Sequence, residues 1–132
     1  MHEGDEIVPT LKQATTIIRR WYLDDCKEYL KTHKRKEPEY KNQLKQYEAL
    51  RVVLAFANEH DCRLISLADA RKIIKETIVT DINFLINMMY AESKTDAQML
   101  AIYRGHKECF EMLLHYAQQN EKKVLKRRCH YE

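Results

Sequence analysis

Residues 95–120 read TDAQMLAIYRGHKECFEMLLHYAQQN, and this stretch decides the expected fold. Thr95 is followed three positions later by Gln98, which is the spacing of a capping box at a helix start. Gly105 can adopt the left-handed backbone conformation that ends many helices. An apolar face then returns at helical spacing, at His106, Phe110, Leu113 and Ala117. The stretch therefore predicts two short helices that are joined by a turn at Gly105.

The composition of the whole chain also favours helices. Its 132 residues are 45% hydrophobic and 33% charged, and they include only two glycines and two prolines. So few turn-forming residues do not suit a many-stranded sheet. A chain of this length can bury one core. We expect a single all-α domain over residues 1–132, a compact bundle of five to six helices, with frayed ends at 1–9 and 121–132.

The N-terminal part predicts a long helical hairpin. Pro9 can occupy the first turn of a helix, and the apolar spacing that follows predicts a helix over residues 10–32. The charged segment 33–37 interrupts this pattern. Pro38 can begin a second helix, whose apolar stripe continues to residue 57. We expect these two helices to pair in antiparallel orientation.

The middle of the chain predicts two shorter helices. Ser66 is a good N-cap with Asp69 three positions later, so a third helix is expected over residues 67–78. A fourth helix, capped by Thr80 or Asp81, is expected to continue through Tyr90. No glycine or proline separates the two, and one continuous, bent helix is the alternative.

The order of residues within 96–120 is also distinctive. A Leu-Ala pair, a Gly-His pair, a glutamate and a Leu-Leu pair follow one another, at Leu100, Ala101, Gly105, His106, Glu108, Leu113 and Leu114. In this order the stretch resembles one ankyrin repeat, although the Thr-Pro-Leu-His opening and the Gly-Ala-Asp closing of that family are absent. The resemblance implies a helix-turn-helix unit that binds a protein partner and carries no chemistry of its own. About three repeats are needed for stability, and residues 66–91 could supply only one further, degenerate repeat.

The same residues also resemble the last two helices of a death-fold domain of the caspase-recruitment type. In that family a glycine separates helices five and six, and the second of them is apolar. Both resemblances imply a protein-interaction module that acts as an adaptor, an inhibitor or an assembly subunit. The predicted contact edge surrounds Gly105 and consists of Tyr103, Arg104 and Lys107.

Nucleic-acid binding is the first alternative function. The formal net charge is +3, and basic residues cluster at Lys34, Arg35 and Lys36 and again at Lys126, Arg127 and Arg128. If both clusters shared one face, they could contact phosphates. The more ordinary interpretation is that cations near the C-termini of helices interact favourably with the helix dipole.

A small zinc-binding helical protein is the second alternative. His60 with Cys62, and His106 with Cys109, could supply four tetrahedral ligands. These pairs lack the usual spacing of zinc sites, and a cysteine at helical spacing is more often a small buried hydrophobic residue. We therefore expect no metal and no other cofactor.

Several observations bear on catalysis and on the compartment. No serine or cysteine lies in a recognisable nucleophile motif, and two glycines are too few for a phosphate-binding loop, so we expect no enzyme.

No apolar run approaches the roughly 20 residues that cross a bilayer, and the N-terminus is acidic, unlike a signal peptide. The four cysteines are widely spaced. We expect reduced thiols in an intracellular protein of the cytoplasm or nucleus, with no membrane partner.

Overall fold

The structure is a computed structural model that describes residues 9–91 and 97–131. These ranges form four continuous helices and no strand, so the all-α prediction is confirmed, whereas the predicted number of five to six helices is wrong. The first helix consists of α1 (Leu11–Ile18), the π-helical segment η1 (Arg19–Leu23) and α2 (Asp24–Thr32). The second is α3 (Pro38–Ala57). The third consists of α4 (Leu67–Ile74), the π-helical segment η2 (Lys75–Val79) and α5 (Thr80–Ala91), and the fourth is α6 (Ala97–Tyr131).

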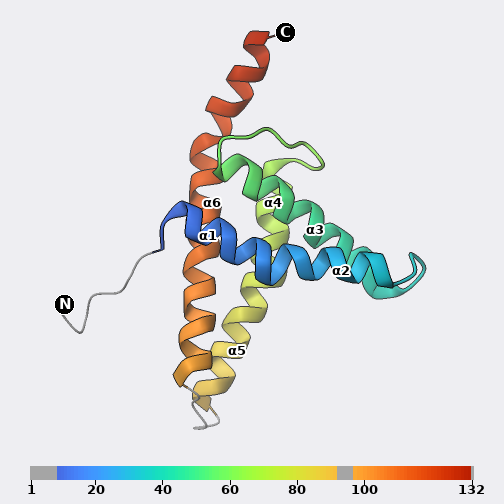
Figure 1. The fold of residues 1–132 in the computed structure, drawn as a ribbon, viewed down its shortest axis with the longest axis vertical. Coiled ribbons are helices and arrows are strands. Elements are labelled where there is room, and N and C mark those ends of the chain that lie inside the picture. Colours follow the sequence, from blue (N-terminus) through green and yellow to red (C-terminus); the bar gives the residue numbers. More distant parts are fainter. Residues whose placement is uncertain (1–8, 92–96, 132) are drawn as a thin grey trace, which may run out of the picture.

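The first helix and α3 form the predicted hairpin (Figure 1). Thr10 is the N-cap of α1, and its hydroxyl accepts a hydrogen bond from the Gln13 amide while the Gln13 side chain accepts one from the Thr10 amide. Pro9 therefore lies just before the helix rather than in its first turn. Pro38 begins α3 as expected, because its ring cannot donate a hydrogen bond and the first turn requires none.

The predicted third and fourth helices are one helix. Ser66 is its N-cap as predicted, because the Ser66 hydroxyl accepts a hydrogen bond of 3.1 Å from the Asp69 amide. The π-helical segment η2 then carries the chain from α4 into α5 without a break. A π turn admits one extra residue and weakens the regular hydrogen-bond ladder. The hydroxyl of Thr80, the first residue of α5, donates a hydrogen bond of 2.8 Å to the carbonyl oxygen of Lys75 in η2 and so satisfies one acceptor of this segment.

The turn that we predicted at Gly105 is absent. α6 passes through this position as one helix of 35 residues, and Gly105 does not have a positive φ. The helix break on which the two family resemblances relied is therefore not present. Buried residues lie on both sides of the glycine, at Leu100 and Phe110. A glycine inside a helix costs only about 1 kcal/mol relative to alanine, and the packing of these residues on the core outweighs that cost.

The sequence also led to predictions for both ends of α6. Residues 121–131, for which we expected fraying, continue α6 as helix, and its last turns project beyond the other helices (Figure 1). The capping box that we predicted at Thr95 lies outside the described residues, as do residues 1–8 of the expected N-terminal frayed end.

The core surrounds the middle of α6, which contacts α1, α3, α4 and α5. Its largest fully buried side chains are Phe110, Ile18, Leu50, Ile74, Leu113, Val52, Val53 and Cys109. A polar contact joins α6 to the end of α3, because the Asn120 amide donates to the carbonyl oxygens of Phe56 and Ala57 at 3.1 and 3.0 Å. The last carbonyls of a helix lack partners within it. Asn120 therefore both satisfies these groups and fixes the position of α3 on α6.

Candidate interaction surface

The predicted contact edge lies on a straight helix and not around a turn. Tyr103 is half-buried and packs against the core, and Lys107 is also half-buried. Arg104 is exposed. Because α6 is continuous here, Tyr103 and Lys107 lie one turn apart and Arg104 lies beside them, so the three share one side of the helix and do not project from a loop.

The two basic clusters lie in different parts of the molecule (Figure 1). Lys34, Arg35 and Lys36 lie in the loop between α2 and α3, whereas Lys126 and Arg127 lie on the projecting part of α6. The side chain of Arg128 lies outside the described residues. The condition that both clusters share one face is therefore not met by the residues that the structure describes.

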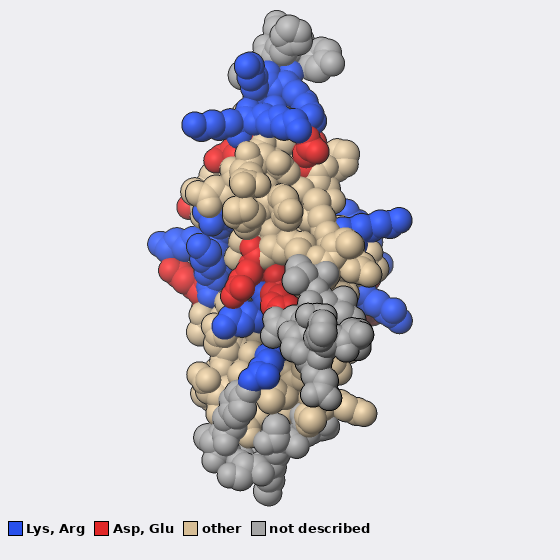
Figure 2. Space-filling view, turned by 90° about the vertical axis from the view of Figure 1, so that its left-hand side faces the viewer, with Lys and Arg blue, Asp and Glu red and all other residues tan. Residues whose placement is uncertain are grey.

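The C-terminal part of α6 is nevertheless strongly basic. Figure 2 shows Lys and Arg side chains gathered there, at the top of the view, and the sequence supplies them as Lys122, Lys123, Lys126 and Arg127. Glu59 pairs with Lys123 and Arg127, which lowers the pKa of its carboxyl group through hydrogen bonds to both cations. All three side chains are substantially exposed to solvent. Part of the positive charge is therefore balanced, and Lys122 and Lys126 form no ion pair with a described carboxylate.

The four residues considered as alternative zinc ligands lie in two environments. His60 and Cys62 lie in the loop between α3 and α4, whereas His106 and Cys109 are buried on α6. No three metal-ligating side chains within the described ranges lie close enough to hold one ion. Burial raises the pKa of the Cys109 thiol, so this group stays protonated and packs as a small apolar side chain.

His106 belongs to a group of rings that joins the first helix to α6. Its Nδ1 atom shares a hydrogen bond of 2.8 Å with the Tyr22 hydroxyl. The Tyr22 ring also meets Phe110 edge to face at 4.8 Å between centroids, and Trp21 lies 5.0 Å from the His106 ring. Burial lowers the pKa of His106 and raises that of Tyr22. Both groups are therefore neutral at pH 7, and the pair is a structural contact in the described molecule.

An exposed apolar surface that we did not predict from the sequence lies at the end of the molecule opposite the C-terminus (Figure 1). Five of the large hydrophobic side chains that are exposed lie on α5 and on the first turns of α6, which contact each other. We call them the α5–α6 apolar surface, and they are Phe84, Leu85, Met88, Met99 and Ile102. Phe84 is the most exposed, at 61%.

This surface comes from two stretches of sequence that contain no charged residue. Neither the range 82–91 nor the range 97–103 includes Asp, Glu, Lys or Arg, although a third of the whole chain is charged. These two uncharged stretches are the signal by which the surface could have been found. An apolar stripe on a helix usually faces the interior, so the apolar residues alone do not distinguish this surface from the core.

No helix of the described ranges combines the length and the apolar character that crossing a bilayer requires. In comparisons with known proteins the chain matches no family model, no curated protein and no solved structure. Its function is therefore inferred from the surfaces of the described residues alone.

Proposed function

We propose that this chain is a protein-interaction module that acts by binding and not by catalysis, with the α5–α6 apolar surface as its contact site. The observation that carries the proposal is the exposure of five large hydrophobic side chains on two adjacent helices. Monomeric proteins in water rarely expose such groups together, and where they do, the patch commonly binds another molecule.

The chemistry of the surface defines the partner. A charged group of a partner would lose its hydration against these five apolar side chains, none of which can supply an opposite charge, and this costs free energy. The partner is therefore a protein that presents an apolar face. Phe84 is the natural anchor, since aromatic residues dominate binding energy at such contacts. Met88 and Met99 are flexible and can adapt to the shape of the partner.

The predicted contact edge becomes the rim of this site. Tyr103, Arg104 and Lys107 follow Met99 and Ile102 along α6. Interfaces commonly combine an apolar centre with a polar rim that remains in contact with water. The proposal therefore keeps these three residues as polar contacts and moves the centre of the interface to α5.

A site-specific crosslinking experiment tests this proposal. A photoreactive phenylalanine at position 84 should crosslink the partner in cells, while the same group at the exposed Leu44 of α3 should not. The captured protein, purified separately, should bind the chain directly. Phe84→Asp and Met88→Asp should each weaken that binding at least about tenfold, and Leu44→Asp should leave it unchanged.

The variants in this experiment change exposed side chains, so their thermal midpoints should stay close to that of the natural chain. Direct binding that survives Phe84→Asp and Met88→Asp would refute the assigned contact site. A crosslink only to a second copy of the chain, together with dimers in sedimentation velocity, would replace the adaptor function by self-assembly.

A second candidate function is nucleic-acid binding by the C-terminal part of α6. The observation in its favour is the concentration of Lys122, Lys123, Lys126 and Arg127 on one projecting helix end. Binding through phosphate contacts must weaken steeply as salt is added. Titration of single- and double-stranded oligonucleotides at about 50 and 200 mM salt tests it, and no binding at the lower salt concentration would remove it.

The state of the cysteines supports an intracellular location. Cys26, Cys62 and Cys109 are free thiols. Disulfides are rare in the cytoplasm and nucleus, where thiols stay reduced. We propose one of these two compartments, and fluorescence microscopy of the tagged chain tests the assignment.

A further inference from the structure

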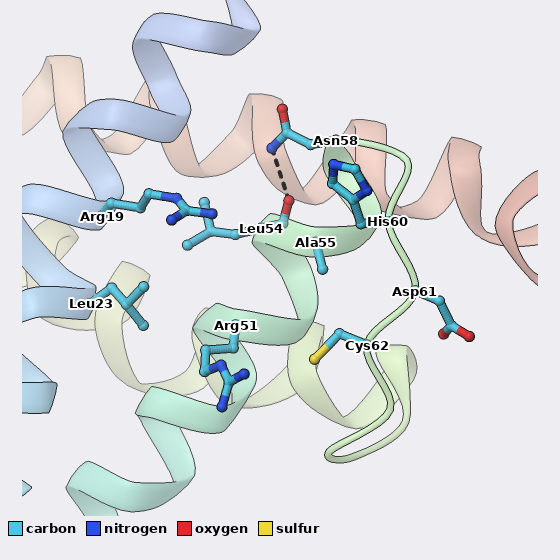
Figure 3. A pocket seen from close by; sticks show the side chains of 9 residues that line it. All are labelled: Arg19, Leu23, Arg51, Leu54, Ala55, Asn58, His60, Asp61 and Cys62. Carbon is cyan, nitrogen blue, oxygen red and sulfur yellow. Dashed lines mark hydrogen bonds between the residues drawn. The ribbon is translucent and has the colours of Figure 1, made fainter.

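A pocket of about 380 Å³ lies between the first helix, α3 and the loop that follows α3 (Figure 3). Three separate segments of the chain supply its walls. They contribute Arg19 and Leu23 from η1, Arg51, Leu54 and Ala55 from α3, and Asn58, His60, Asp61 and Cys62 from the loop. The volume lies in the range of small-molecule sites.

The pocket carries an excess of positive charge. Neither Arg19 nor Arg51 forms an ion pair with any carboxylate that the structure describes, and Arg51 instead lies 5.6 Å from the centre of the Tyr47 ring. Asp61 is the single acidic residue among those that line the pocket. Its carboxylate accepts a hydrogen bond from Arg63 at 3.2 Å and points away from the pocket (Figure 3). The pocket is therefore lined by two arginine side chains that pair with no described carboxylate.

The loop side of the pocket is held in place by several bonds. The Asn58 amide donates to the Leu54 carbonyl oxygen at 2.8 Å and to the Thr15 hydroxyl at 3.0 Å, which ties the loop to both helices. Glu59 has a positive φ of 62°, and the His60 amide donates to the Ala55 carbonyl oxygen at 2.8 Å. These bonds end α3 in a Schellman motif and fix the backbone of His60 at the rim.

We propose that this pocket binds a phosphate monoester. A guanidinium group donates two parallel hydrogen bonds to oxygen atoms of one anion. A phosphate monoester offers three terminal oxygens and a charge of about −1.5 to −2 at pH 7, so it can engage Arg19 and Arg51 together. A carboxylate, with two oxygens and a single charge, satisfies only one of them. Leu23, Leu54 and Ala55 then contact the organic group of the ester.

The site is independent of the α5–α6 apolar surface, because it shares no residue with it. Either a free small phosphate ester or a phosphorylated side chain of another protein supplies this chemistry. Phenyl phosphate represents the first source, and a short uncharged peptide with one phosphoserine represents the second. Tighter binding of the peptide assigns the site to phosphorylated proteins, and tighter binding of phenyl phosphate assigns it to small esters.

Isothermal titration of the full chain at low salt tests the proposal. Phenyl phosphate should bind saturably with one site per chain. Arg19→Gln and Arg51→Gln should each weaken the binding roughly tenfold to a hundredfold, the loss expected for a hydrogen-bonded ion pair. Arg20→Gln is the matched control, because Arg20 is the exposed neighbour of Arg19 and does not line the pocket. It should bind as the natural chain does.

Amide chemical shifts of the unmodified chain provide a readout that needs no variant. Phenyl phosphate should shift the signals of Asn58, His60 and Cys62 most strongly. Benzoate, a carboxylate of similar size, should bind at least about tenfold more weakly, because it carries less charge and fewer oxygens. The proposal is wrong if no saturable binding is observed, if benzoate binds equally well, or if both arginine variants bind like the control.

Discussion

His106 and Tyr22 are polar groups that the fold places inside the contact between the first helix and α6. Their hydrogen bond of 2.8 Å gives each a partner away from water. An unpaired polar group in this position would cost about 1–3 kcal/mol, so the two side chains depend on each other. Burial lowers the pKa of His106, which means that the folded state disfavours its protonation.

The first prediction concerns the pH dependence of stability. The unfolded chain protonates His106 with an ordinary pKa near 6.5, whereas the folded chain does so only at lower pH. The unfolded state therefore binds more protons in this window. The free energy of unfolding should be highest above pH 6.5 and should fall as the pH drops through 6.5 toward the lowered pKa. The slope from this one group can reach at most about 1.4 kcal/mol per pH unit.

Urea denaturation of the natural chain and of His106→Asn between pH 8 and pH 5 measures this effect. The asparagine side chain places a polar atom near the position of the His106 Nδ1 atom, and it does not titrate. The difference in unfolding free energy between the two proteins should shrink as the pH falls below 6.5. Parallel pH profiles for the two proteins would show that His106 is not the responsible group.

At the scale of the element, the continuity of α6 gives the second prediction. A methyl group added at Gly105 would meet no atom within 4 Å, and the backbone there is helical. Gly105→Ala should therefore raise the free energy of unfolding by about 0.5–1 kcal/mol, because alanine has the higher helix propensity. Urea denaturation of this variant and of Ala101→Gly, an exposed position on the same helix, should give changes of opposite sign. A loss of stability in Gly105→Ala would indicate the turn that we first predicted.

Helix starts proved easier to predict than helix continuity. Pro38 and Ser66 are local signals that act within one turn, and both begin helices as expected. Gly105 is also a local signal, but packing of the residues around it overrides it. The π-helical segments η1 and η2 have no glycine or proline, so nothing in the sequence marks them. Continuity of a helix depends on tertiary contacts that a short window of sequence does not contain.

At the scale of the whole molecule, the two candidate sites also differ in whether the sequence alone could reveal them. The α5–α6 apolar surface leaves a trace in the sequence, because its residues lie in two uncharged stretches. The phosphate pocket leaves none, since Arg19, Arg51 and His60 are far apart in the chain and only the packing of three segments brings them together. Predicting such a site requires the fold first.

The third prediction concerns how far along α6 the side chains contribute to the free energy of unfolding. Val124 is buried, whereas Lys126 and Arg127 are exposed. Arg127→Ala should lose only about 0–1 kcal/mol of stability, because the lost pair between Arg127 and Glu59 lies at the surface. Val124→Ala should cost about 1–3 kcal/mol, because it leaves a cavity in the core. Thermal and urea denaturation compare the two, and equal losses would contradict this prediction.

The unbroken course of α6 also sets a distance. A helix of 35 residues is roughly 50 Å long, at about 1.5 Å per residue. Its first turns carry exposed apolar side chains of the α5–α6 apolar surface, and its last turns carry lysines and arginines (Figure 1). The helix thus works as a stiff spacer between two chemically different ends. A partner bound at one end of α6 would lie far from a partner bound at the other end. Two partners of small size would therefore be able to bind at the same time without contacting each other.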